Sequence, residues 1–483
     1  MAKKILSKLS TYILLIGGII GLQTIGHIEI ARCQELQNRK KSYCTFIKKT
    51  KITYPSKFLY KQILNVVKLK NSYGGTFTTS GLVTYSMPEV KERFNKFNSG
   101  FNFYYPKGTR SNAGYLILAA ADPLYDGEPL IELWDMNNQE LLYKWRINTK
   151  YLLEEIGINY RSNSLRLRSP LLLDDANIVV PVNEGPLIKL APNGEILKIN
   201  KEYIFHHSVE KDEQGRIYVP IFFNDYEDYS GWDEGFAILD EDLNVLDTYS
   251  LREIFKNAGL DYKLNYFSPS QDPFHLNDVQ PLKDQVSTNI VLLSLRNQSS
   301  IIAFDIKKRN IIWVLEGYFN LQHDVDILDK EGTAISIFDN NITPNTNYQK
   351  ESNGNIFTIV KNLPSLFKIN EEIIMLSYPE DLKSVNKINI TKEKFSKLDK
   401  NLIPKTISEG NSELIFENNS ITIEETNYGR LFEYDLKRKE VLWEYINRND
   451  KKDLHYMMGW SRRLNVLPES VKSVLSFNND IKL

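Results

Sequence analysis

Residues 301–313 read Ile301-Ile-Ala-Phe-Asp305-Ile-Lys-Lys-Arg-Asn-Ile311-Ile-Trp313, which is an apolar run closed by an aspartate, a polar turn and a second apolar run. Two apolar runs on either side of a short polar turn are typical of a β-hairpin. The sequence repeats this pattern elsewhere and therefore predicts a recurring two-strand unit. The other copies are residues 131–145, 236–246 and 431–443, with a weaker copy at 187–197.

The spacing of these hairpins indicates the architecture. Their first runs end at positions 135, 191, 240, 305 and 435, so the intervals are 56, 49, 65 and 130 residues. The last interval is twice the one before it, which predicts one degenerate or insertion-laden unit between 340 and 430. Four-stranded units at such a period are the signature of a β-propeller. We therefore expect an all-β, six-bladed propeller over residues 111–483, with an insertion at about 341–428.

Composition excludes one class of partner. The 483 residues carry 60 Lys and Arg against 61 Asp and Glu, so the net charge is −1. A protein with this net charge has no overall positive potential to attract a polyanion, so we expect no nucleic acid partner.

The N-terminus is typical of a signal anchor or signal peptide over residues 1–30. Lys3, Lys4 and Lys8 precede residues 9–28, which carry no formal charge. At about 1.5 Å per residue this stretch just reaches the roughly 30 Å of a bilayer core. We see no small-residue cleavage pattern and favour an uncleaved anchor over a removed signal, with a buried core helix as the alternative. Basic residues also follow the apolar run, so charge alone does not orient it.

Residues 31–110 are interpreted as a linker and lid. Cys33 and Cys44 are the only cysteines. They would be able to pair after export and would stay thiols in the cytosol, and their spacing fits no metal site.

Three of the six histidines share one local pattern. His207, His275 and His323 each open a short polar stretch that leads through a turn into a strongly apolar strand. Equivalent positions in successive blades are related by rotation about the propeller axis. We therefore expect the three imidazoles to converge at one mouth of the central channel.

Hairpin counting adds neighbours to these histidines. The turn at 283–287 is centred between His275 and Arg296, so the return strand brings Arg296 opposite His275. The same count places Asn340 beside His323, and Pro220 opposite His207.

Three imidazoles with a guanidinium fit an anion better than a metal ion. Arginine keeps its proton and would repel a cation, whereas its planar fork suits tetrahedral oxyanions. A neutral imidazole can attack sulfur or phosphorus and later leave, which is covalent catalysis without a cofactor. We assign no metal and no cofactor.

The remaining candidates carry weaker signals. Strand alternation predicts that His206 faces away from its neighbour His207. His27 and His455 lack the pattern and are expected to be structural. Arg168 and Arg462 fall near equivalent positions in other blades, where a surface role is an equal alternative.

Several motifs follow one another in a fixed order over residues 110–465. They are His206-His207, Phe274-His-Leu-Asn-Asp278, Leu293-Ser-Leu-Arg-Asn-Gln298, Gln322-His-Asp324, Phe338-Asp-Asn-Asn341 and Gly429-Arg-Leu-Phe-Glu-Tyr-Asp435. Together they resemble the bacterial arylsulfate sulfotransferases, also called arylsulfotransferases. The resemblance implies a six-bladed propeller that moves a sulfuryl group from a phenolic sulfate ester to a phenol without a nucleotide sulfate donor, usually in the periplasm. We therefore expect a membrane-anchored protein on the periplasmic side of the inner membrane, or a periplasmic one.

Residue by residue, the resemblance makes His323 the transiently sulfated nucleophile. It implies that His207, His275 and Arg296 hold the sulfuryl oxygens and that Asn277 is the Asn of a His-x-Asn element. Asn277 and Asn340 are candidates for substrate binding, with plain turn roles as the alternative.

Two other classes of function stay open from the residues alone. A metal-dependent propeller enzyme would use His207, His275 and His323 as ligands. A non-catalytic propeller that binds a sulfated or carboxylated ligand would keep Arg296 but form no covalent intermediate.

Overall fold

The computed structural model describes residues 88–125, 127–156, 165–182, 184–223, 233–265, 273–282, 289–342, 355–366, 373–376, 388–406 and 408–477. The chain divides into two compact units, residues 1–76 and 77–483, and every described residue belongs to the second. The expected anchor, His27, Cys33 and Cys44 therefore lie outside the described residues. Within the described part, no helix is long and apolar enough to cross a membrane.

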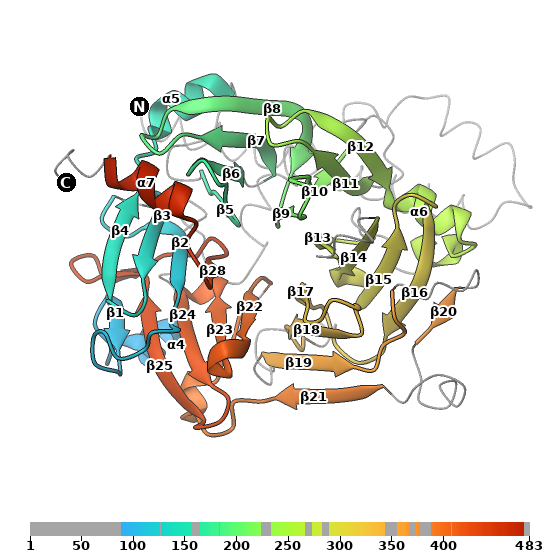
Figure 1. The fold of residues 1–483 in the computed structure, drawn as a ribbon. Coiled ribbons are helices and arrows are strands. Elements are labelled where there is room, and N and C mark those ends of the chain that lie inside the picture. The colour runs from blue at the N-terminus through green and yellow to red at the C-terminus, as the bar shows by residue number, and fades with distance from the viewer. Residues whose placement is uncertain are drawn as a thin grey trace, which may run out of the picture. The chain divides into compact units, whose positions relative to one another are not determined.

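The second unit is an all-β propeller, as the repeat predicts. Its antiparallel sheets stand around a common axis with their inner strands toward the centre (Figure 1). Four separate sheets have four or five strands each. In spatial order they are β28 (Arg462–Leu464), β2 (Tyr115–Asp122), β3 (Glu128–Asp135) and β4 (Glu140–Lys144); β13 (Leu276–Pro281), β14 (Ile290–Leu295), β15 (Ser300–Asp305), β16 (Asn310–Glu316) and β20 (Ile374–Met375); β17 (His323–Ile327), β18 (Ala334–Asp339), β19 (Ile356–Lys361) and β21 (Asn389–Glu393); and β22 (Asn411–Ile415), β23 (Ser420–Glu425), β24 (Arg430–Asp435), β25 (Glu440–Ile446) and β1 (Gly100–Phe103).

The expected count of six separate blades is not what the strand pairing gives. Beside the four separate sheets lies one continuous eight-stranded sheet, in which β8 and β10 pair through Phe205 with Ile221 and Ile204 with Phe222. This short pairing joins two groups of strands that the hairpin spacing treats as separate units. The sheet contains β5 (Leu171–Leu172), β6 (Ile178–Pro181), β7 (Gly185–Leu190), β8 (Ile196–Phe205), β9 (Glu210–Lys211), β10 (Ile217–Phe222), β11 (Glu234–Leu239) and β12 (Val245–Ser250).

The strands also show how two segments at the edges of the predicted repeat are organised. The segment 341–428, where the hairpin spacing predicts a degenerate or insertion-laden unit, supplies propeller strands, because β19, β21, β22 and β23 all lie in it and pair within two sheets. Residues 88–110 also contact the propeller, because β1 pairs with β25 and the helix α4 (Pro88–Phe94) packs against Tyr428 and Ile446. The other helices are α5 (Thr149–Ile156), α6 (Leu251–Asn257) and α7 (Glu469–Phe477), and a two-stranded ribbon is formed by β26 (Arg448–Asn449) and β27 (Leu454–His455).

The repeated hairpin itself is confirmed, and its aspartate explains the repeat. In β15–β16, the carboxylate of Asp305 accepts hydrogen bonds from the backbone N–H groups of Lys307 and Lys308 at 3.0 and 2.9 Å. Asp435 does the same in β24–β25. An acidic side chain at this place satisfies turn N–H groups that the strands leave unpaired.

Three of the hairpins carry a tryptophan into the space between neighbouring sheets. Trp145, Trp313 and Trp443 follow the turns of three hairpins, and each is at most 1% exposed. They lie in three different apolar clusters, so the core of the propeller is a series of layers between sheets. This burial keeps the inner strands fixed around the axis.

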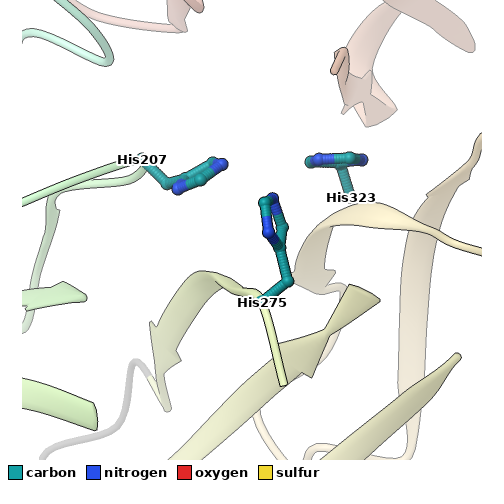
Figure 2. A group of neighbouring side chains, drawn as sticks. All are labelled: His207, His275 and His323. Carbon is teal, nitrogen blue, oxygen red and sulfur yellow. The ribbon is translucent and has the colours of Figure 1, made fainter. Parts of the chain in front are cut away.

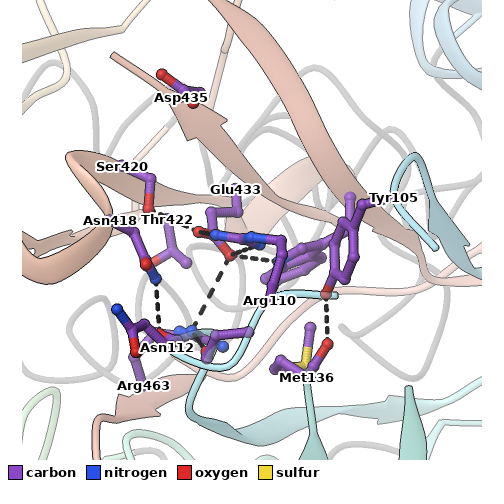
Figure 3. A network of polar contacts seen from close by, with 12 residues as sticks. Tyr105, Arg110, Asn112, Met136, Asn418, Ser420, Thr422, Glu433, Asp435 and Arg463 are labelled. Carbon is purple, nitrogen blue, oxygen red and sulfur yellow. Dashed lines mark hydrogen bonds and ion pairs between the residues drawn. The ribbon is translucent and has the colours of Figure 1, made fainter. Parts of the chain in front are cut away.

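A buried carboxylate connects two neighbouring sheets (Figure 3). Glu433 on β24 accepts hydrogen bonds from Arg110 at 2.6 Å, from Ser420 Oγ at 2.6 Å and from Trp443 Nε1 at 2.6 Å. Arg110 belongs to the segment that enters β2, so this ion pair connects the first strands of the propeller to its last sheet. Burial would raise the pKa of Glu433, but the charges of Arg463 and Arg110 hold that pKa below its usual range.

We predict that Glu433→Gln lowers the free energy of unfolding by about 3 kcal/mol, because it leaves the buried Arg110 charge without its carboxylate. Denaturant titration of the purified protein measures this. The control Glu440→Gln changes a carboxylate that is more than half exposed and should alter stability by less than about 0.5 kcal/mol. Equal stability of the two variants would contradict the assigned role of Glu433.

Candidate active site

The three patterned histidines converge at the propeller axis (Figure 2). The ring centroids of His207 and His275 are 5.0 Å apart, and His323 lies 6.1 Å from each of them. One nitrogen from each ring can be chosen so that the three lie within 4.8 Å of one another. Imidazoles from three segments that are far apart in the sequence therefore share one site.

The backbone just before each inner strand explains this convergence. His207 and His275 adopt left-handed φ values of 58° and 53°, and next to His323 the residue Asp324 has φ 55°. Non-glycine residues rarely take this conformation, and its cost is accepted mainly where the surrounding structure fixes it for a functional purpose. The same turn recurs at Ser169 and Trp460, with φ values of 46° and 62°. The propeller thus repeats one local geometry around the axis.

Inter-blade hydrogen bonds hold these turns in register. The Val209 N–H donates to Ser169 Oγ at 3.4 Å, and the Val279 N–H donates to Ser208 Oγ at 3.3 Å. Two further bonds continue the series, from Val325 N–H to Asp278 Oδ2 at 3.0 Å and from Ser412 N–H to Asp324 Oδ2 at 2.7 Å.

His323 is held in one orientation and is completely buried. Its Nδ1 lies 2.6 Å from Asn340 Oδ1, and its Nε2 makes no hydrogen bond with any residue that the structure describes. Burial, then the positive charge of Arg296, lowers the pKa of His323 well below its ordinary value. The ring is therefore neutral at physiological pH, and the expected position of Asn340 beside it is confirmed.

His207 is also neutral and contacts a second histidine. Burial, followed by the charge of Arg168, lowers the pKa of His207 well below its usual value. Its Nδ1 lies 2.8 Å from Nδ1 of His206, so the prediction that His206 faces away is wrong. The register is also one residue from the expected one, because the His206 N–H, and not that of His207, bonds the Pro220 carbonyl.

Arg296 lies where the hairpin count places it. Its backbone N–H donates to the His275 carbonyl at 3.1 Å, and its Nη1 donates to Asn297 Oδ1 at 2.8 Å. The guanidinium is close enough to His323 for its charge to act on that ring.

Asn277 is buried between two blades. Its side-chain amide donates to the Gln322 carbonyl at 2.8 Å, which fixes the residue immediately before His323. The contacts therefore give Asn277 a positioning role toward His323.

Several residues other than histidine also belong to the site. The Trp460 ring lies 5.7 Å from the His207 ring and 6.0 Å from the His323 ring. Arg168 and Glu409 form an ion pair at 2.7 Å, and Arg166 binds the same carboxylate with two nitrogens. The alternative of a surface role for Arg168 is wrong, because its side chain is buried. Aligning the segments before every inner strand would have pointed to Arg168 and Trp460.

A cavity of about 50 Å³ adjoins the cluster at Trp460. Its lining is polar and includes the carboxylates of Glu210, Asp324 and Glu413, with Arg462 bound to Glu210 at 2.8 Å. Burial, followed by the nearby Glu210 charge, raises the pKa of the neighbouring Asp278 to about 7. Several carboxylates therefore lie close to the histidine cluster.

His455 lies apart from the cluster. Its ring is buried 5.9 Å from that of Phe94, and burial lowers its pKa to about 4. Its contacts are those of a structural residue.

The histidine cluster is also the one group in the described part of the chain whose geometry would suit a metal ion. Two nitrogens on one Zn²⁺ at about 2.0–2.1 Å each lie within about 4.2 Å of each other, so a spread of up to 4.8 Å would have to contract. The charges of Arg296 and Arg168, both felt at these rings, oppose a cation and favour an anion.

Comparison with solved structures gives distant likenesses. A protein of unknown function from Bacteroides caccae aligns with a TM-score of 0.44 at 9% identity, over 72% of this chain and 98% of that one. The C-terminal WD40 domain of Sif2 aligns with a TM-score of 0.32 at 9% identity, over 72% of this chain and 75% of that one. Both scores are below 0.5, so the fold assignment rests on the strand pairing described above.

No curated protein matches the chain. A family model, described as arylsulfotransferase (ASST), matches residues 195–448, which is more than half of the chain. The matched range contains His207, His275, Arg296 and His323. This chain belongs to the arylsulfotransferase family.

Proposed function

We propose that this protein moves a sulfuryl group from a phenolic sulfate ester to a phenol through a sulfohistidine at His323, without a nucleotide sulfate donor or a cofactor. Family membership implies a sulfotransferase enzyme with small phenolic substrates. The observation that carries the mechanism is the state of the His323 ring, which is bonded at Nδ1 and open at Nε2.

The Asn340 contact fixes the tautomer of His323. An amide oxygen only accepts hydrogen bonds, so the nitrogen 2.6 Å from Asn340 Oδ1 must carry the proton. The lone pair is then on Nε2, which has no hydrogen-bond partner among the described residues. With its pKa lowered, the ring needs no base before it attacks.

In the first step, the Nε2 lone pair of His323 forms a bond to sulfur while the bond from sulfur to the aryl oxygen breaks. The aryl oxygen leaves with the electron pair as a phenolate. Positive charge develops on the imidazole, and the hydrogen bond from Nδ1–H to Asn340 Oδ1 stabilises it. Arg296 and the neighbouring imidazoles bind the sulfuryl oxygens, where loss of one such donor typically costs about 3 kcal/mol of transition-state stabilisation.

In the second step, the acceptor phenol loses its proton to an imidazole while its oxygen attacks sulfur and the nitrogen–sulfur bond breaks. The contacts favour His207 as this base. Glu234 Oε1 lies 3.6 Å from His206 Nε2, which favours a proton there and leaves His206 Nδ1 as the acceptor for His207 Nδ1–H. The lone pair of His207 is then on Nε2, available to the phenol.

A metal-dependent enzyme is the second candidate, because the three imidazoles come close enough together to be considered as ligands. Metal analysis of active protein distinguishes this candidate from the sulfohistidine mechanism. A stoichiometric transition metal that is required for turnover would support the metal-dependent enzyme. A binding propeller without catalysis would form no sulfohistidine.

We also propose that the eight-stranded sheet comprises two blades, β5–β8 and β9–β12, so that the propeller has six. The support is that β8 and β10 pair over two residues only, and that β5 and β9 each begin after a left-handed or histidine turn like those before β13 and β17. An experimental structure that resolves one undivided eight-stranded blade would contradict this count.

The cellular location is proposed from the N-terminal sequence and the family. We propose that residues 1–30 anchor the enzyme on the periplasmic side of the inner membrane. Membrane fractionation of the full chain and of a chain without residues 1–30 tests this, and equal recovery of both in the soluble fraction would contradict it.

We predict that His323→Ala abolishes transfer from a chromogenic aryl sulfate and loses the sulfuryl adduct that mass spectrometry detects on the wild-type peptide containing residue 323. The control His455→Ala also removes a buried imidazole, but one outside the cluster, and should retain the adduct. Full turnover by the folded His323→Ala variant would reject the nucleophile.

A second prediction concerns the tautomer. Asn340→Leu removes the acceptor for Nδ1–H and should lower kcat by about 10²-fold with little change in KM, because the lone pair no longer stays on Nε2. Asn340→Asp keeps an acceptor and should recover most of the loss above the pKa of His323, but the added carboxylate raises that pKa and should shift the acid limb of the pH profile upward. Steady-state kinetics measures both; equal kcat values for the two variants would contradict a positioning role for Asn340.

The third prediction is a pH profile. Because the pKa of His323 lies well below its ordinary value, protonation removes the nucleophile only at low pH. The acid limb of kcat/KM should therefore fall below pH of about 6, under the ordinary histidine pKa. An acid limb at or above pH of about 7 would mean that His323 is not the group that must be neutral.

A further inference from the structure

Arg168 is a buried arginine in the segment that leads into β5, the inner strand of its group. It lies three residues before the start of β5, as His207 lies three residues before the start of β9, and it directly precedes Ser169, which has a left-handed φ. The side chain is 6% exposed, and its charge is the strongest one acting on His207.

The hydrogen-bonding capacity of Arg168 is mostly unused. Nη2 donates to Glu409 Oε1 at 2.7 Å, whereas Nε and Nη1 make no hydrogen bond with any part of the chain that the structure describes. A buried guanidinium with unpaired N–H groups is costly, and an ordered water or a bound anion can offset that cost. Burial and the neighbouring Arg166 charge lower the pKa of Arg168 to about 10, so it still carries its charge at neutral pH.

The Glu409 carboxylate has a second ion-pair partner besides Arg168. Arg166 binds both oxygens of this carboxylate, at 3.0 and 2.6 Å, and also donates to the Met458 carbonyl. Burial alone would raise the pKa of Glu409, but Arg166 and Arg168 lower it to about 2. If Arg168 turned to another anion, the carboxylate would remain paired through Arg166.

The local charges favour such an anion. Arg166 and Arg168 face Glu409, with Glu184 as a further acidic group acting on Arg168, while Arg296 adds positive charge from the His323 side. His207 and His323 are neutral. These charges would favour a bound anion between Arg168 and Arg296.

We infer that Arg168 is a second oxyanion-binding residue of this site, which exchanges its Glu409 partner for oxygens of the bound sulfuryl group. This rests on the proposed function. Arg296 binds the group from the side of His323, and Arg168 binds it from the side of His207. Glu409 competes for Arg168 when no anion is present and so sets how tightly sulfate and its esters are held.

The test measures binding of inorganic sulfate by calorimetry, alongside turnover of a chromogenic aryl sulfate. Arg168→Met keeps an unbranched side chain without the guanidinium and leaves Glu409 paired with Arg166, so it should fold. It should weaken sulfate binding by about tenfold or more, because a charged hydrogen bond is lost. Glu409→Gln removes the competitor and should tighten sulfate binding by about threefold or more.

The opposite signs separate a ligand role from a structural one, because a purely structural ion pair would make both variants bind sulfate more weakly. If the wild type binds sulfate and Arg168→Met binds it equally well, the inference fails while the proposed function stands. Weaker binding by a folded Glu409→Gln variant also overturns it. If the wild type neither binds sulfate nor turns over an aryl sulfate, the proposed function fails as well.

Discussion

The site depends on a belt of hydrogen bonds that passes from blade to blade around the axis. In each, a backbone N–H of one inner strand donates to a side chain at the turn of the preceding one: Val209 to Ser169, Val279 to Ser208, Val325 to Asp278, and Ser412 to Asp324. The belt runs directly beside the residues that carry the chemistry. Because each turn is hydrogen-bonded to the next, these bonds stabilise the left-handed backbone conformation, which would be unfavourable in an isolated turn.

This arrangement makes a rigid site from distant segments. A catalytic geometry tolerates displacements of only about 0.5 Å, and strands hold side chains more firmly than loops do. Here Asn277 binds the Gln322 carbonyl, and Asn340 binds the His323 ring, so His323 is fixed from two directions. The apolar layers between sheets, such as those around Trp313, keep these strands from shifting.

Much of the site was predictable because hairpins impose a register. Counting residues about a turn placed Arg296 beside His275 and Asn340 beside His323, and both contacts are present. The count placed Pro220 opposite His207, whereas the structure pairs Pro220 with His206, one residue earlier in the chain. The left-handed turn at His207 accounts for this shift.

Trp460 and Glu409 could not be found from a histidine pattern, because rotational symmetry conserves backbone position and not side-chain type. The number of separate sheets was not predictable either, since the hairpin period does not reveal the pairing of β8 with β10.

The arginine charges near His207 and His323 have two effects on this cluster. Burial, followed by the Arg168 charge at His207 and the Arg296 charge at His323, lowers the pKa of both imidazoles, so both rings are neutral. In the proposed mechanism, the same positive charge is complementary to a sulfuryl group, whose oxygens carry negative charge. Glu409 acts in the opposite direction and raises the pKa of His323, but burial and the Arg296 charge outweigh it. Arg166 and Arg168 both form ion pairs with this carboxylate, so its negative charge is balanced inside the buried cluster.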